Sequence, residues 1–119
     1  MSSIRHSILP LVLFFAASTA FAHAKLLSST PVPSSVVTEA PKEIRLTYNE
    51  ELEVQFSKIT LSDAQHADVS LPPAQLDKSN SKILLATLPT LKPGTYQVQW
   101  SAMTRDGHKT KGQFTFQVK

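Results

Sequence analysis

Residues 94–118 have the sequence GTYQVQWSAMTRDGHKTKGQFTFQV, and this stretch decides the fold class. Apolar and polar side chains alternate strictly over 94–102 and again over 113–118. Such alternation is typical of strands with one face on a core and the other in water. The segment between them contains Asp106-Gly107, which favours a turn. The stretch therefore predicts two strands joined by a loop.

Shorter segments elsewhere carry the same pattern, and prolines, serines and a glycine separate them. We expect further strands at residues 24–29, 42–48, 56–61, 69–71 and 83–88. No window of about a dozen residues has the apolar stripe of a helix. The sequence therefore predicts an all-β protein, an immunoglobulin-like β-sandwich of about seven strands. It would have no disulfide, because the chain contains no cysteine.

The first 22 residues have the features of a cleaved export signal. A short positive start ending at Arg5 precedes an apolar run over residues 8–17, and Ala20 and Ala22 are the small residues that a signal peptidase reads. The apolar run is shorter than the ~20 residues that a membrane span needs. We expect cleavage between Ala22 and His23, which leaves residues 23–119 as one domain.

Composition excludes several classes of function. The absence of cysteine rules out thiolate zinc sites, iron–sulfur clusters and cysteine nucleophiles. The formal net charge is +3, and loss of Arg5 with the signal lowers it to +2. The basic residues form neither a sustained run nor a patch with interleaved aromatics, so we expect no binding of nucleic acid.

Cleavage before His23 would create an unusual ligand for a metal. A histidine at a free N-terminus offers its α-amine and its imidazole Nδ1 to the same ion, and the two nitrogens close a chelate ring. An internal histidine cannot do this, because its backbone nitrogen is an amide. Cu(II) prefers tetragonal coordination by nitrogen and oxygen. The predicted N-terminus therefore favours copper.

A second candidate element is the segment Asp106-Gly107-His108. Gly107 permits a turn that would bring the carboxylate and the imidazole together. The aspartate could bind a metal directly, or it could accept a hydrogen bond from a ligand and so orient that ligand. Taken alone, the Asp-x-His spacing is a weak signal, and these residues favour a solvated loop over a metal site. The spacing alone does not show that His23 and His108 meet, since 85 positions separate them.

Over nearly its whole mature length the chain resembles the CopC family of periplasmic copper-resistance proteins. The resemblance rests on several blocks that occur in the same order, namely HAKLLSSTP at 23–31, YNEEL at 48–52, QFS at 55–57, LKPGTYQVQW at 91–100, DGH at 106–108, and the ending with Gly112, FTF at 114–116 and VK at 118–119.

The resemblance implies a Greek-key β-sandwich and a periplasmic Cu(II) site. It carries over His23 as the amine and imidazole ligand, His108 as the second imidazole, Asp106 as a nearby carboxylate and Glu50 as an acidic residue near the metal. It also implies a monomeric carrier or buffer, with a membrane copper transporter of the CopD type as its partner. Several family members have a methionine-rich loop that binds Cu(I), but residues 62–74 here contain no methionine.

For two remaining side chains, His66 and Met103, we expect a structural role without metal binding. His66 would be an exposed loop residue, because no sulfur ligand lies beside it in the sequence. Met103 would pack against the fold, with a weak axial contact to the metal as the alternative.

Two other classes of function remain open on the sequence. The first is an oxidative copper enzyme, since polysaccharide monooxygenases also use an N-terminal histidine with a second histidine on a β-sandwich. The aromatic residues here lie in phase with the strands, which leaves no spare set for a flat sugar-binding surface. The second is a metal-free interaction module, which failure of the mature chain to retain one Cu(II) would support.

Overall fold

The computed structural model describes residues 3, 10 and 23–119, so the predicted signal peptide and its cleavage site lie outside the described residues, apart from the two isolated positions. Nine strands and one turn of 3₁₀-helix make up the described part. They are β1 Leu26–Thr30, β2 Val36–Val37, β3 Glu43–Tyr48, η1 Val54–Phe56, β4 Lys58–Ser62, β5 Asp68–Val69, β6 Gln75–Asp77, β7 Asn80–Thr87, β8 Gly94–Met103 and β9 Lys109–Val118.

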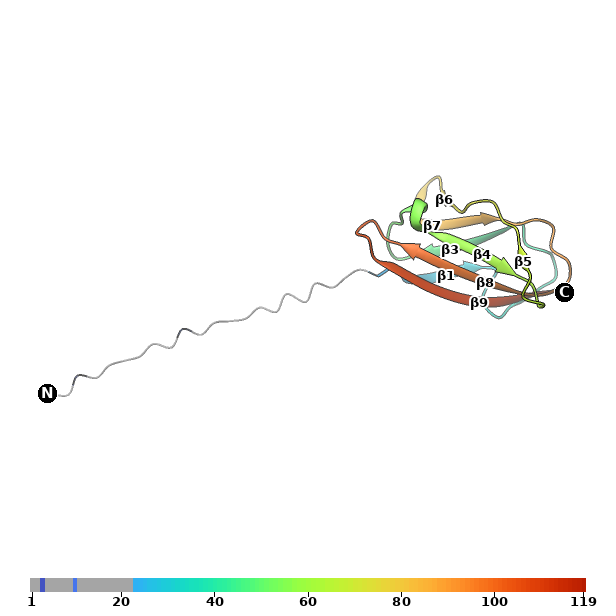
Figure 1. The fold of residues 1–119 in the computed structure, drawn as a ribbon, viewed down its shortest axis with the longest axis horizontal. Helices are drawn as coiled ribbons and strands as arrows, with labels where there is room; N and C mark the ends of the chain where they lie inside the picture. Colours follow the sequence, from blue (N-terminus) through green and yellow to red (C-terminus); the bar gives the residue numbers. More distant parts are fainter. Residues whose placement is uncertain (1–2, 4–9, 11–22) are drawn as a thin grey trace.

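The strands form two sheets, which lie face to face in Figure 1. One sheet has the order β1-β3-β7-β6, and the other has the order β2-β9-β8-β4-β5. The chain crosses between the sheets after each of β1, β2, β3, β5 and β7. The predicted all-β sandwich is confirmed. In the described part of the chain, no helix is long and apolar enough to cross a membrane.

The alternating segments bury the faces that the sequence predicts. Ile44, Leu46 and Tyr48 of β3 are almost completely buried. From the other sheet, β8 and β9 contribute apolar side chains to the same core. These are Tyr96, Val98, Ala102, Phe116 and Val118, with Trp100 and Phe114 only partly buried against them.

Several element boundaries differ from those expected. The last strand begins at Lys109 rather than residue 113, because β9 pairs with β8 along all of its ten residues. Residues 54–56 form the 3₁₀ turn, so β4 begins at Lys58. Two short strands, β2 and β6, were not expected. Each lies at the edge of a sheet and is too short to show a sequence period.

The β8–β9 hairpin places its loop at one end of the sandwich. Its register runs from Gly94 opposite Val118 to Met103 opposite Lys109. The blue start of the described ribbon lies at the same end, opposite the C-terminus (Figure 1). The first residues of the described domain therefore lie beside this loop.

Candidate metal centre

The structure brings the two candidate histidines together. The ring centroids of His23 and His108 lie 5.4 Å apart, and the rings meet edge to face at 76°. His23 is exposed, whereas the His108 side chain is 31% exposed. An ion beside this pair would contact both residues and would still be open to solvent on the His23 side.

Hydrogen bonds to the next two residues hold His23 in place. The Thr110 hydroxyl donates to the carbonyl of the buried Ala24 at 2.8 Å. The Lys25 amide donates to Asn49 Oδ1 at 2.7 Å, and the Asn49 amide donates back to the Lys25 carbonyl at 3.2 Å. The start of the described domain is thus fixed to β9 and to the turn after β3.

A tight turn holds His108. The Thr104 amide donates to the His108 carbonyl at 2.9 Å, and the Gly107 amide donates to the Thr104 carbonyl, also at 2.9 Å. Gly107 has φ +89°, a conformation that side chains disfavour, so a glycine suits this position. Thr104 is buried and forms an isolated bridge with Leu52, which anchors the turn to the core.

Asp106 orients the imidazole of His108. Its Oδ1 lies 3.0 Å from His108 Nδ1, and it also accepts a hydrogen bond from the Thr104 hydroxyl. The hydrogen bond from Thr104, followed by that from His108, holds the pKa of the Asp106 carboxyl below its ordinary value. Because Nδ1 is committed to this carboxylate, Nε2 is the nitrogen through which His108 would bind a metal.

Glu50 lies near Asp106 but not in the histidine pair. The two residues line one small hollow together with Glu51, Thr104 and Arg105. Arg105 pairs with Glu51 at 3.0 Å, which places a guanidinium close to these carboxylates. Of the four sequence-predicted residues, the structure therefore brings His23, His108 and Asp106 together and places Glu50 beside the aspartate.

Side chains alone do not complete a metal site in the described part of the chain. Among these residues, no group of three or more histidine, cysteine, aspartate or glutamate side chains could hold a metal ion. The two imidazoles would need a further donor. A free α-amine on His23 is one such donor, and it exists only if the chain is cut before this residue.

His66 lies in an exposed loop and Met103 lies partly packed against the fold, as the sequence predicts. His66 is exposed, in a turn that its amide closes on the Asp63 carbonyl at 3.0 Å. Met103 is half-buried at the end of β8, where its backbone amide donates a hydrogen bond to Ser57 Oγ at 3.1 Å.

Sequence reasoning missed the residues that support the site. Thr104 and Thr110 hold the turn and the start of the chain, and Asn49 was noticed only as part of a matched block. A threonine two residues before an aspartate is a weak turn signal. The bond from Thr110 to Ala24 joins residues 86 positions apart, so no local signal could have found it.

The fold and this arrangement define a class of protein: a small β-sandwich with a histidine pair at one end, one ring held by a carboxylate. Comparison with known proteins makes the assignment specific. The model of the CopC domain matches residues 26–119, and the chain belongs to the CopC domain family. The matched residues do not include His23.

Similar proteins cover nearly the whole chain. Protein YobA of Escherichia coli K12 is 36% identical over 118 residues, 98% of this chain and 95% of that protein. Copper resistance protein C of Xanthomonas campestris pv. juglandis is 31% identical over 123 residues, 98% of this chain and 96% of that protein. Copper transport protein CutJ of Bacillus subtilis is 30% identical over 93% of this chain but only 21% of that protein.

Solved structures share the fold. The crystal structure of CopC from Methylosinus trichosporium OB3b superposes with a TM-score of 0.77 at 26% identity, covering 82% of this chain and 94% of that one. PcoC, a methionine-rich copper resistance protein from Escherichia coli, gives a TM-score of 0.74 at 33% identity, covering 82% of this chain and 100% of that one.

Proposed function

We propose that this protein is a periplasmic copper carrier or buffer that holds Cu(II) at the His23–His108 pair. The observation that carries the proposal is the 5.4 Å approach of the two rings across 85 positions of sequence. Membership in the CopC family and relatives named for copper resistance support copper as the cargo.

The donor set suits Cu(II). After cleavage His23 supplies its amine and Nδ1, and His108 supplies Nε2, which gives three nitrogen donors for a tetragonal ion. Asp106 keeps the His108 ring in the tautomer and orientation that present Nε2. The fourth position is left for water, for Glu50 or for a ligand from a partner.

The exposure of His23 suits transfer of the ion. A ligand at the surface can be replaced stepwise by donors of an acceptor protein, whereas a closed site would retain the metal. A membrane copper transporter of the CopD type is the acceptor that we propose. The similarity of this chain to one fifth of a longer protein named for copper transport supports such a pairing.

Competitive Cu(II) titration of the exported protein tests the proposal. We expect one Cu(II) per chain and a loss of affinity of at least about tenfold in His108→Ala, which corresponds to ~1.4 kcal/mol of binding free energy. The matched control is His66→Ala, which removes an exposed histidine of the β4–β5 turn and should leave the affinity unchanged. Failure to retain one Cu(II), or equal losses in the two variants, would contradict the proposal.

Binding should also weaken as the pH falls. Imidazole and amine groups must lose their protons to bind a metal. Free groups of these types protonate between about pH 8 and pH 6. We expect the Cu(II) affinity of the exported protein to fall between pH 7.5 and pH 5, and a flat profile would mean that other groups hold the ion.

A further inference from the structure

One edge of the five-stranded sheet is only partly covered. Strand β5 pairs with β4 at Leu61 and Ser62 alone. Continuing this register would place Pro72 opposite Lys58, but a proline has no amide hydrogen to donate. The chain leaves the edge after Val69 and crosses to β6 in the other sheet. Within the described residues, no strand pairs with the outer side of Lys58–Thr60.

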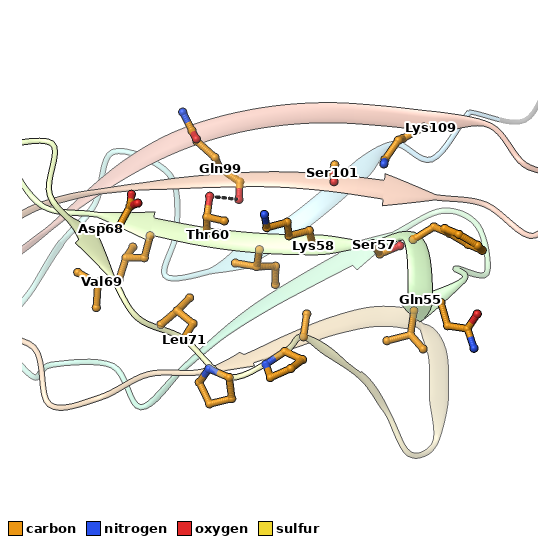
Figure 2. A pocket seen from close by; sticks show the side chains of 17 residues that line it. Gln55, Ser57, Lys58, Thr60, Asp68, Val69, Leu71, Gln99, Ser101 and Lys109 are labelled. Atoms are coloured by element: carbon orange, nitrogen blue, oxygen red, sulfur yellow. Dashed lines mark hydrogen bonds between the residues drawn. The ribbon is translucent and has the colours of Figure 1, made fainter.

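A hollow of about 950 Å³ lies beside this uncovered edge. Figure 2 shows its lining side chains spread along β4, from Gln55 at one end to Asp68 at the other. Much of the lining is apolar, and it includes Phe56, which is 55% exposed, and Val54, which is 36% exposed. An exposed aromatic residue beside an unpaired strand edge is a surface that an extended chain can cover.

The charges at the two ends of the hollow are opposite. Lys109 of β9 lies toward the Gln55 end, Lys58 of β4 lies near the middle, and Asp68 of β5 lies at the other end (Figure 2). Neither lysine forms an ion pair with any described residue. Between the ends, Gln99 and Ser101 of β8 offer neutral polar groups. The part of the hollow that contains the two lysines is therefore complementary to a carboxylate.

We propose that this hollow binds an extended acidic segment of a partner protein by addition of a strand to β4. The segment would continue the antiparallel pairing that β5 begins, so its C-terminal end would lie beside Lys58 and Lys109. Acidic residues there would meet the two ammonium groups, and an apolar side chain would cover Phe56. A peptide is the occupant because the uncovered edge presents unpaired backbone N–H and C=O groups. Another extended backbone can form hydrogen bonds with several of them, one after another along the strand. This proposal does not depend on copper.

NMR titration of the ¹⁵N-labelled exported protein without metal tests the proposal. The probe is the acetylated peptide VTVTVEE, and its matched controls are VTVTVKK and VTPTVEE. We expect VTVTVEE to shift the amide signals of residues 58–60, 69–71 and 74. The lysine peptide should bind at least about tenfold more weakly because its charges are reversed, and the proline peptide should also lose affinity because it lacks one amide hydrogen.

A pair of double variants locates the contact. Lys58→Glu with Lys109→Glu should weaken VTVTVEE at least about tenfold, whereas Lys82→Glu with Lys92→Glu, which makes the same change in net charge outside the hollow, should leave it nearly unchanged. Equal effects of the two pairs, or shifts confined to other residues, would overturn the site. Equal binding of the proline peptide would overturn strand addition, and this comparison uses the unmodified protein.

Discussion

At the scale of single residues, the His108 imidazole depends on two neighbours that do not bind metal in our proposal. Asp106 fixes its Nδ1, and Thr104 fixes both Asp106 and the His108 carbonyl. Supporting groups of this kind typically change metal affinity by 10–100-fold when they are removed. Their effect comes through the orientation of the ring.

This arrangement predicts a graded response to substitution. Asp106→Asn keeps the shape of the side chain but removes its charge, so we expect a loss of Cu(II) affinity smaller than that of His108→Ala. Titration against one competing chelator measures both variants. An Asp106→Asn loss equal to or larger than the His108→Ala loss would mean that the aspartate is itself a ligand.

Tyr48 presents a different case, because its hydroxyl is buried and has no hydrogen-bond partner among the described residues. Burial raises the pKa of Tyr48. A buried polar group without a partner costs about 1–3 kcal/mol, whereas the ring packs edge to face on Trp100 at 5.2 Å between centroids.

We therefore expect Tyr48→Phe to keep the ring packing and to raise the free energy of unfolding by up to about 1 kcal/mol. Urea denaturation followed by circular dichroism measures the change. A clear loss of stability would show that the hydroxyl has a partner in solution.

The candidate site shows what sequence reasoning can reach at this scale. His23, His108 and Asp106 could be named because their chemistry and their blocks are local in sequence. Their contact could not be derived, since it depends on the fold. Thr110 could not be named at all, because its role is a single bond to Ala24 across the whole domain.

At the scale of elements, the β8–β9 hairpin depends on Gly112. A Cβ atom placed there would lie 2.4 Å from Cζ2 of Trp100, whose ring crosses the glycine from the opposite strand. This distance is far below a normal contact, and an indole ring cannot bend away. The glycine therefore permits the close approach of the tryptophan to β9.

We expect Gly112→Ala to move the Trp100 ring and to cost about 1–3 kcal/mol of stability, as overpacking commonly does. The chain has one tryptophan, so its fluorescence reports this movement directly. Unchanged stability together with an unchanged emission spectrum would contradict the packing described.

The β6–β7 hairpin has a pH-sensitive turn. Asp77 accepts hydrogen bonds from the Ser79 amide at 2.9 Å and from its hydroxyl at 2.7 Å, and it pairs with Arg45 at 3.3 Å. The Ser79 hydrogen bonds first, and Arg45 after them, hold the pKa of the Asp77 carboxyl below its ordinary 3.8. A lowered pKa stabilises the fold above the ordinary value, and this stabilisation is lost as the pH falls through the folded-state value.

We expect Asp77→Asn to be less stable than the unmodified protein at pH 7, with a difference that shrinks as the pH is lowered toward 3. Thermal unfolding of both proteins across this range measures it. A difference that stays constant with pH would mean that the charge of Asp77 contributes nothing.

The long strands could be predicted because their apolar residues repeat every second position over six or more residues. The edges of the sheets could not be predicted. β2 consists of two residues and is defined by its parallel pairing with β9, which leaves no trace in the local sequence. β6 likewise forms because β7 lies beside it.

At the scale of the whole molecule, the described domain brings its first residues beside the β8–β9 loop at one end, and it does so without a disulfide. Cu(II) that bridges His23 and His108 would act as a crosslink between these segments. The unfolded mature chain would still bind Cu(II) through the amine and ring of His23. The ion therefore stabilises the folded state only by the extra affinity that the bond to His108 provides.

We therefore expect Cu(II) to raise the unfolding temperature. At 100 times its dissociation constant, the gain in free energy of unfolding should be less than the ~2.7 kcal/mol that a ligand supplies when the unfolded chain does not bind it. The rise should largely disappear in His108→Ala, as differential scanning calorimetry would show. An equal rise in the variant would mean that His108 does not contribute to the stabilisation by Cu(II).

The central claim is that one residue, His23, gives Cu(II) both its backbone nitrogen and its ring. Cu(II) titration of the exported protein against a form with one extra alanine before His23 tests this claim most directly. The extension keeps both imidazoles but turns the amine into an amide, so we predict a loss of affinity of at least about a hundredfold, or ~2.8 kcal/mol. Equal affinity in the two forms would contradict the account.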